Sequence, residues 1–425
     1  MSKTQRRAAI LGGTRTPFVK SFTSYKHVTN QDLLTAALAK LVGNHKLEGE
    51  LIDEVALGAV IKHSADFNLA RESVLGTSLD PSTPAYDLQR ACGTGLEAAA
   101  QVALKIGAGQ VECAIAGGTD TNSDAPVVFS RRFGWKLIDA RSARTTLDKL
   151  STLAGIKPSD LVPVVPQVRE PRTGLSMGEH CEKMVQEWGI TREEQDQLAL
   201  ASHQAAARAY EKGFYKDILF PFNGIEKDTF VRGDTSLEKL AKLKPAFDFS
   251  GKGTLTAGNS TPLTDGAAVT LLGSEAWAAK RGLTPLAYLV DAQAAAVDFV
   301  HGEGLLMAPT IAVSRLLERN GLKLQDFDFY EIHEAFAGQV LCTLKAWESD
   351  EYCKRRLKRD RAMGPIDRTK MNVNGGSLAL GHPFAATGSR CLTSMAKTLA
   401  LAGKGRGLIS VCTAGGMGVV AIVER

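Results

Sequence analysis

The chain has 425 residues, of which 44% are hydrophobic and 23% charged, and this ordinary globular composition excludes a largely disordered protein. Its 51 basic and 46 acidic residues give a formal net charge of +5, a balance too even to indicate a nucleic-acid-binding protein. Its 7 cysteines are scattered without a paired metal-type spacing, which predicts reduced thiols, no disulfide, no metal site and a cytoplasmic protein.

The predicted elements follow the same order in two stretches of the chain. The polar start shows no secretory leader, and no apolar run reaches the ~18 residues of a membrane span. The first stretch contains, in order, strand 8–12, helix 33–42, strands 54–58 and 85–88, helix 96–106 and strand 113–118. The second contains helix 311–317, strand 327–332, helix 390–401 and strand 408–412. The pattern predicts a duplicated α/β unit with mainly parallel sheets, in which the ends of equivalent elements meet at a shared centre.

The segment between the two stretches differs in composition. Residues 125–255 are richer in charge and proline and contain a long helical pattern at 193–212. We interpret this segment as an inserted lid or binding region, and the alternative is a tightly packed part of the first domain. The predicted division is an N-terminal half at 1–124, an inserted loop domain at 125–255, a return to the N-terminal half at 256–284 and a C-terminal half at 285–425.

Cys92 follows a predicted strand and precedes a predicted helix, between Ala91 and Gly93. A thiol at such a turn lies near helix N-terminal amides, which favour the reactive thiolate. An arbitrary free cysteine is more often an inert buried residue. However, Gly93 and Gly95 are poor helix formers at a helix start, and they allow the backbone to approach a substrate. This context predicts that Cys92 is a nucleophile.

His382 and Cys412 lie in two further runs of small residues. His382 stands between Gly381 and Pro383, where no amphipathic period requires a core residue, although a lone loop histidine often has no special role. A base that takes a thiol proton near neutral pH is most often histidine. Cys412 ends a strand and precedes two glycines, so it is either a second acid/base or a space-filling residue. The other five cysteines have no such context and are interpreted as packing or surface residues.

Two further segments are candidate parts of the site. His333 directly follows the predicted strand 327–332, where it would reach the same sheet edge. A purely structural interpretation is a helix N-terminus with Glu334 in its first turn, and the two interpretations can both hold. The polar turn at 256–266, which includes Ser260 and Thr261, suits ligand contacts or a simple loop.

At this point the residues match a known family: the chain resembles thiolases over nearly its whole length. Four blocks occur in the family's order, namely the cysteine turn at Cys92, Glu-Ala-Phe at 334–336, Gly-His-Pro at 381–383 and the block at 412–418. The resemblance implies an α/β fold of five layers, αβαβα, in which two similar halves with mixed sheets carry an inserted loop domain that binds coenzyme A (CoA). It implies CoA as co-substrate and no permanently bound cofactor.

The resemblance also implies a role for each residue. Cys92 would accept the acyl group, His382 would be its base and Cys412 the acid/base. The backbone amides of Cys92 and Ala414 would serve the attacked carbonyl, while His382 and a water held near His333 would serve the thioester enolate. Ser260 and Thr261 would contact CoA.

Two positions depart from the commonest thiolase pattern. His333 stands where many thiolases carry asparagine, and Ala414 replaces the usual first glycine of the terminal block. With the runs at 383–388 and 260–265, His333 makes the chain most similar to the thiolase subunits of fatty-acid oxidation complexes. That likeness implies a degradative 3-ketoacyl-CoA thiolase, an acetyl-CoA C-acyltransferase of β-oxidation. It also implies a homodimer or dimer of dimers and a partner chain with hydratase and dehydrogenase activities.

Other functions are alternatives to a degradative thiolase. A biosynthetic acetoacetyl-CoA thiolase uses the same residues, and a non-catalytic acyl-CoA-binding protein would keep the fold. A decarboxylating ketosynthase normally pairs two histidines with its cysteine, so Cys412 argues against it. The glycine runs surround cysteine and histidine and show no dinucleotide fingerprint, which disfavours a nucleotide-binding dehydrogenase.

Overall fold

The computed structural model describes residues 7–164 and 168–425; the polar start at 1–6 and residues 165–167 of the predicted insertion lie outside them. Within this part the strands form one sheet in the order β4-β3-β5-β6-β1-β7-β10-β9-β8, and β2 pairs with β6. The strands are β1 (Ala8–Arg15), β2 (Val19–Lys20), β3 (Glu54–Leu57), β4 (Ala85–Asp87), β5 (Cys113–Asp120), β6 (Thr264–Ser274), β7 (Ala287–Ala296), β8 (Phe329–Ile332), β9 (Arg406–Thr413) and β10 (Met417–Glu424).

The two halves of this sheet repeat one another. The first runs β3-β5-β6-β1 and the second β8-β9-β10-β7, and in both the first pair is parallel and the next two pairs are antiparallel. A parallel bridge from Tyr330 to Met371 takes the place that β4 has beside β3. The halves join where β1 pairs with β7 in antiparallel register, with Ala8 opposite Leu289. The prediction of two similar halves with mixed sheets is therefore confirmed.

The narrower expectation of mainly parallel sheets is wrong. In the second half, β9 and β10 are joined directly by the tight turn at 414–416, and such a short connection only permits antiparallel pairing. In the first half, β6 likewise returns antiparallel to β5 after the long excursion between them. Each half thus combines parallel strands with an antiparallel return.

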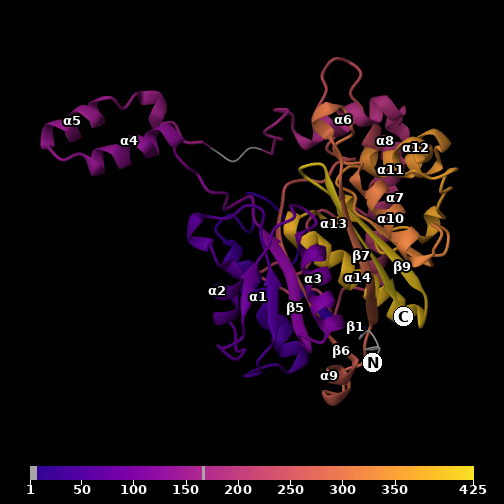
Figure 1. Cartoon of the computed structure of the whole chain (residues 1–425). Coiled ribbons are helices and arrows are strands. Elements are labelled where there is room, and N and C mark those ends of the chain that lie inside the picture. The colour runs from indigo at the N-terminus through magenta and orange to yellow at the C-terminus, as the bar shows by residue number, and fades with distance from the viewer. Residues whose placement is uncertain (1–6, 165–167) are drawn as a thin grey trace.

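The helices form layers around and between the two halves of the sheet (Figure 1). α3 (Thr94–Ala108) and α14 (Thr387–Ala402) pack against each other in the middle and contact strands of both halves. α1 (Asn30–His45) and α2 (Leu69–Leu75) cover the first half, while α10 (Ala308–Asn320) covers the second and packs against α11 (Ala337–Glu348). The order of layers is αβαβα, as the family resemblance implies. Buried apolar clusters fill the space between successive layers.

The two middle helices approach each other at backbone contact. A Cβ atom added to Gly388 would lie 2.2 Å from the backbone nitrogen of Leu96, and one added to Gly95 would lie 2.8 Å from the carbonyl oxygen of Ala385. A side chain at either position would force the helices apart. The small residues near the starts of α3 and α14 therefore set the distance between the two halves.

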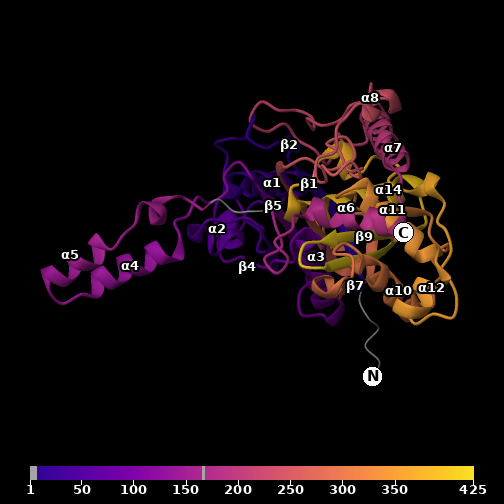
Figure 2. The same cartoon turned by 90° about the horizontal axis from the view of Figure 1, so that it is seen from above.

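Between β5 and β6 the chain leaves the sheet. The helices of this excursion are α4 (Arg131–Ser142), α5 (Thr146–Ala154), α6 (Met177–Trp188), α7 (Arg192–Glu211) and α8 (Leu237–Ala241). α6 and α7 pack on α11, whereas the α4–α5 hairpin stands away from the body in both views (Figures 1 and 2). The hairpin exposes large apolar side chains, among them Trp135, Ile138 and Leu147.

The remaining helices are α9 (Glu275–Lys280), α12 (Asp350–Arg356) and α13 (Ser377–Leu380). In the described residues, every helix is too short or too polar to cross a membrane.

Candidate active site

Cys92 lies in the short turn that connects β4 to α3. The preceding residue, Ala91, has a φ of 43°, a left-handed conformation that non-glycine residues rarely adopt. The hydroxyl of Thr94 holds this turn, since it accepts the backbone N–H of Arg90 at 2.9 Å and donates to the carbonyl of Ala91 at 2.7 Å. The strained turn places the thiol directly before the N-terminus of α3.

His382 lies against this thiol. Its Nε2 is 3.2 Å from Sγ of Cys92, and its Nδ1 is 2.6 Å from the hydroxyl oxygen of Thr387, in the first turn of α14. The histidine is 4% exposed, and burial, followed by the charge of Arg390, lowers its pKa to about 3. His382 is therefore neutral at physiological pH, as a base must be before it accepts the thiol proton.

Opposing effects act on the Cys92 thiol itself. Burial raises its pKa to about 12, whereas hydrogen bonds from the backbone amides of Ala414 and of Cys92 itself lower it. In the absence of substrate the thiol is thus uncharged and paired with a neutral imidazole. The two amides that the family resemblance assigns to an oxyanion hole are the same two that point at the sulfur.

Cys412 occupies the end of β9, next to the turn that carries Ala414. It is 1% exposed, and its pKa lies well above the usual value, first because of burial and then because of the nearby Cys92. The backbone amide of Ala335 is also in hydrogen-bond contact with its sulfur. The structure therefore brings Cys92, His382 and Cys412 into one site.

His333 follows the last residue of β8 and is fully buried. Its ring centroid lies 4.1 Å from that of His382, and its Nδ1 is 2.8 Å from the hydroxyl oxygen of Ser377. Its Nε2 has no partner among the described residues. The alternative interpretation, with Glu334 in the first turn of a helix, is wrong, because α11 begins only at Ala337. Glu334 instead accepts hydrogen bonds from buried polar groups behind the site.

Ser260 and Thr261 lie beside the 334–336 segment. Thr261 donates both its backbone N–H and its hydroxyl to the carbonyl of Ala335, each at 3.0 Å. Ser260 is bridged to Phe336 and is 6% exposed, and its hydroxyl has no partner in the described part of the chain. Of the two, Ser260 is the one whose side chain is available for a ligand contact.

Two carboxylates at the site were not predicted from the sequence. Glu170, which is 7% exposed, accepts the backbone N–H of Gly415 at 2.7 Å and raises the pKa of Cys92. Asp120 accepts backbone N–H groups of Val60, Ile61 and Ala385, and burial raises its pKa to about 7. Glu170 stands in an irregular proline-containing segment and gives no sequence signal. Asp120 ends a buried strand whose sheet edge carries the catalytic candidates, and this position was a usable signal.

Known proteins are similar to this chain over nearly its whole length. The family described as "Thiolase, N-terminal domain" matches residues 8–276, and "Thiolase, C-terminal domain" matches residues 283–425. The chain is 43% identical over 424 residues to a 3-ketoacyl-CoA thiolase of Pectobacterium carotovorum subsp. carotovorum (strain PC1), covering 98% of this chain and 96% of that protein. It is 44% identical over 424 residues to a 3-ketoacyl-CoA thiolase of Serratia proteamaculans (strain 568), covering 98% and 97%.

A solved structure, the acetyl-CoA acetyltransferase of Bacillus anthracis, superposes with a TM-score of 0.83 at 32% identity, covering 100% of both chains. The chain therefore belongs to the thiolase family. It is an acyltransferase of this family, which uses CoA as a substrate and no prosthetic cofactor.

Proposed function

We propose that the chain is a degradative 3-ketoacyl-CoA thiolase, an acetyl-CoA C-acyltransferase of fatty-acid β-oxidation. It cleaves a 3-ketoacyl-CoA with CoA to give acetyl-CoA and a shortened acyl-CoA. The observation that carries the proposal is the 3.2 Å contact between Sγ of Cys92 and Nε2 of His382, with a second thiol at the same site. The full-length relatives named above carry this activity in their names.

In the first half-reaction, neutral His382 takes the proton of Cys92, and the thiolate attacks the 3-keto carbon. The amides of Cys92 and Ala414, which already face the sulfur, donate to the oxyanion that forms. The C2–C3 bond then breaks, leaving the acyl group on Cys92 and releasing the enolate of acetyl-CoA. This enolate takes a proton at C2 from the thiol of Cys412.

In the second half-reaction, CoA replaces acetyl-CoA. The Cys412 thiolate takes the thiol proton of CoA, and the CoA thiolate attacks the acyl group on Cys92. The bond to Cys92 breaks, the shortened acyl-CoA leaves, and the Cys92 thiolate takes its proton back from His382. Protons and charges balance over the cycle, and both sulfur groups return to their starting states.

The predicted loop domain at 125–255 would bind the CoA part of both substrates. The hydroxyl of Ser260, which has no hydrogen-bond partner in the described part of the chain, supports a contact from the adjoining turn. Thr261 would act through its backbone neighbours, because its hydroxyl already bonds Ala335. His382 and a water held near His333 would serve the thioester enolate, and the 4.1 Å separation of the two ring centroids supports this shared role.

A biosynthetic acetoacetyl-CoA thiolase is the second candidate, favoured by the structural likeness to an acetyl-CoA acetyltransferase. Thiolysis rates for 3-ketoacyl-CoA substrates of increasing chain length separate the two. The degradative proposal predicts turnover of substrates with six or more acyl carbons, whereas activity confined to acetoacetyl-CoA would contradict it. If Cys92→Ala kept its turnover, the mechanism above would be wrong. A wild-type protein without any turnover would favour the non-catalytic alternative.

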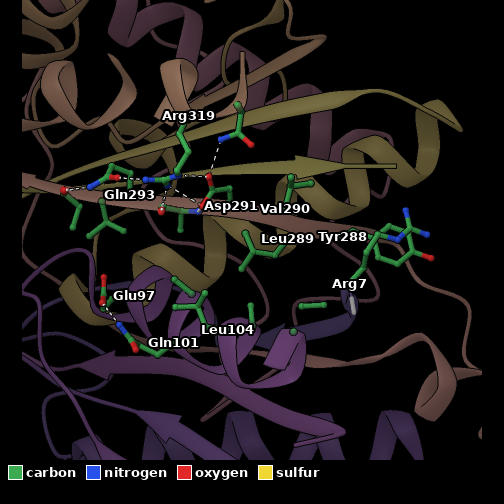
Figure 3. A pocket seen from close by; sticks show the side chains of 18 of the residues that line it. Arg7, Glu97, Gln101, Leu104, Tyr288, Leu289, Val290, Asp291, Gln293 and Arg319 are labelled. Atoms are coloured by element: carbon green, nitrogen blue, oxygen red, sulfur yellow. Dashed lines mark hydrogen bonds and ion pairs between the residues drawn. The ribbon is translucent and has the colours of Figure 1, made fainter. Parts of the chain in front are cut away.

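We further propose a homodimer or dimer of dimers in the cytoplasm, with a partner chain that supplies hydratase and dehydrogenase activities. An open groove of about 1020 Å³ between α3 and β7 supports a subunit contact (Figure 3). Among the described residues, the β1 pairing covers only 287–289 of β7, so in this part of the chain the next residues of β7 present a strand edge in the groove. The exposed apolar side chains of the α4–α5 hairpin support a further contact. Measuring the molecular size of the chain alone tests the homo-oligomer, and repeating the measurement with a candidate partner tests the partner contact.

A further inference from the structure

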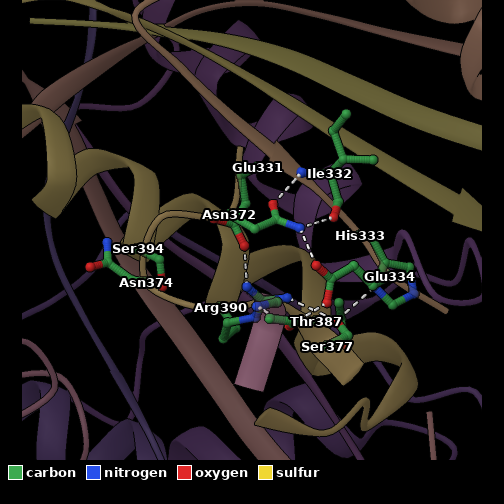
Figure 4. A network of polar contacts seen from close by, with 12 residues as sticks. Glu331, Ile332, His333, Glu334, Asn372, Asn374, Ser377, Thr387, Arg390 and Ser394 are labelled. Carbon is green, nitrogen blue, oxygen red and sulfur yellow. Dashed lines mark hydrogen bonds and ion pairs between the residues drawn. The ribbon is translucent and has the colours of Figure 1, made fainter. Parts of the chain in front are cut away.

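Behind His333 lies a buried polar network that the reaction scheme does not use (Figure 4). We propose that Ser377 is a positioning residue that holds neutral His333 in the tautomer with its proton on Nε2, and that the Glu331–Arg390 ion pair fixes Ser377 for this task. The inference rests on the proposed function, because it assumes that His333 faces the thioester enolate.

The contact between Ser377 and His333 is fully enclosed. Both residues are 0% exposed, and 2.8 Å separates the hydroxyl oxygen of Ser377 from Nδ1 of His333. Burial, His382 and Arg390 all lower the pKa of His333 far below its usual value, so its ring is neutral. A neutral imidazole carries one proton, and the partner of one ring nitrogen therefore decides which nitrogen donates.

Arg390 determines which residue donates in the hydrogen bond between Ser377 and His333. Its Nη2 donates to the Ser377 hydroxyl oxygen at 2.9 Å, and its Nη1 pairs with the carboxylate of Glu331. A guanidinium can only donate, so the hydroxyl accepts from Arg390 and has its own proton left to donate. The acceptor that the described residues offer for this proton is Nδ1 of His333. Nδ1 is then unprotonated, and Nε2 carries the proton.

The opposite tautomer has a physical cost. If Nδ1 donated to Ser377, the hydroxyl proton would be buried without an acceptor in the described part of the chain. In the Nε2–H tautomer one buried polar group, Nε2–H, lacks a partner among the described residues, whereas in the opposite tautomer two groups do, the Ser377 hydroxyl proton and Nε2. This difference of one unpaired buried group favours the Nε2–H tautomer roughly fivefold or more. Nε2, which has no partner among residues 7–164 and 168–425, then presents an N–H beside His382. A neutral donor held ready in this way suits an oxygen that becomes negative only during the reaction.

The backbone that carries Ser377 is also held firmly. Gly376 N–H donates to Ser202 at 3.0 Å, and Leu378 N–H donates to the carboxylate of Glu334 at 3.2 Å. Ser202 itself donates to Glu334 at 2.7 Å. These contacts fix the peptide on both sides of Ser377, so that its side chain reaches His333 in one orientation.

The first test measures two partial reactions of Ser377→Ala. Deuterium exchange at C2 of acetyl-CoA requires the enolate, whereas exchange of an acyl group between an acyl-CoA and labelled CoA requires only acylation of Cys92. We expect C2 exchange and the thiolysis kcat to fall about 10- to 100-fold, with KM and acyl exchange within about threefold. An equal loss of both reactions, or no loss of either, would overturn the proposal.

The second test observes the tautomer directly by NMR of protein labelled with ¹⁵N-histidine, with His333 assigned through His333→Asn. The proposal requires protonated Nε2 in the wild-type protein and a shift toward protonated Nδ1 or mixed tautomers in Ser377→Ala. Protonated Nδ1 in the wild type contradicts it. Ser73→Ala is the control, since Ser73 is as fully buried as Ser377 but its hydroxyl has no partner in the described residues, and both readouts should stay unchanged. If the wild type shows no thiolysis, the proposed function fails while the NMR result still decides the tautomer.

Discussion

Nε2 of His382 lies 3.2 Å from Sγ of Cys92, although 290 positions separate the two residues along the chain. The contact forms because each residue directly precedes a helix of the middle layer, Cys92 before α3 and His382 shortly before α14. These helices belong to the two halves of the duplicated fold and meet at Gly95 and Gly388. The site is thus a product of the interface between the halves.

Gly388→Ala tests this dependence on helix packing. The added methyl group would lie 2.2 Å from Leu96 N, which must move the helices apart. We expect a loss of about 1–3 kcal/mol in the free energy of unfolding, together with slower alkylation of Cys92, because the thiol moves away from His382. Chemical denaturation and iodoacetamide kinetics measure the two effects.

Gly134→Ala is the matched control, since this glycine lies inside α4 and a Cβ there meets no atom of the described residues within 4 Å. Alanine should stabilise that helix by about 0.5–1 kcal/mol and leave alkylation unchanged. Equal effects of the two substitutions would contradict the packing argument.

His382→Asn should change how stability depends on pH. The unfolded chain protonates His382 below its ordinary pKa of 6.5, whereas the folded protein resists protonation down to about pH 3. Since the unfolded state binds more protons in this window, His382 reduces the stability of the wild type as pH falls from 6.5 toward 3. Asparagine removes this effect. The free energy of unfolding of the variant minus that of the wild type should rise by roughly 3 kcal/mol from pH 6.5 to 4. A pH-independent difference would show that His382 titrates normally in the folded state.

Cys412→Ala should separate acyl transfer from carbon–carbon cleavage. Cys92 and His382 keep their contact, so an acyl-CoA should still acylate Cys92. Protonation of the enolate and deprotonation of CoA lose their catalyst, and we expect the kcat of thiolysis to fall about 10²- to 10⁴-fold. Acyl labelling of Cys92 and steady-state thiolysis are the two measurements. A variant that kept wild-type thiolysis would remove Cys412 from the mechanism.

Glu170→Gln should make Cys92 more reactive. The amide oxygen of glutamine keeps an acceptor for Gly415 N–H, while the negative charge that raises the pKa of Cys92 disappears. The thiolate fraction at a fixed pH then increases, and alkylation should accelerate about two- to tenfold. Glu170→Ala, which also loses the contact with Gly415, distinguishes charge from positioning. Slower alkylation of Glu170→Gln would mean that its charge does not oppose the thiolate.

Much of the fold could be predicted from periodicity and strand patterns. The helices at 33–42, 96–106, 311–317 and 390–401 lie within α1, α3, α10 and α14, and the repeated order of elements predicted the two halves. The direction of β6 could not be predicted in this way. It depends on where the chain re-enters the sheet after an excursion of more than a hundred residues, and no local pattern carries that information.

Some residues of the candidate site could likewise be predicted from the sequence, and others could not. Cys92, His382 and Cys412 stand in glycine-rich runs, and the structure places them together as predicted. The role of each in catalysis remains a prediction until it is measured. Glu170 and Ser377 reach the site through tertiary contacts, Glu170 with Gly415 and Ser377 with His333 and Arg390. A charged residue in a loop and a serine after two glycines have no distinguishing local pattern, so only the folded structure reveals them.

The most direct test of the proposed mechanism is to trap the acyl group on Cys92. A 3-ketoacyl-CoA is mixed with the protein without free CoA, the reaction is quenched in acid, and the digested protein is analysed by mass spectrometry. The proposed mechanism predicts an acyl group two carbons shorter than the substrate on Cys92, with one equivalent of acetyl-CoA released and no adduct in Cys92→Ala. Acylation of a different residue, or thiolysis that proceeds without any covalent adduct, would contradict it.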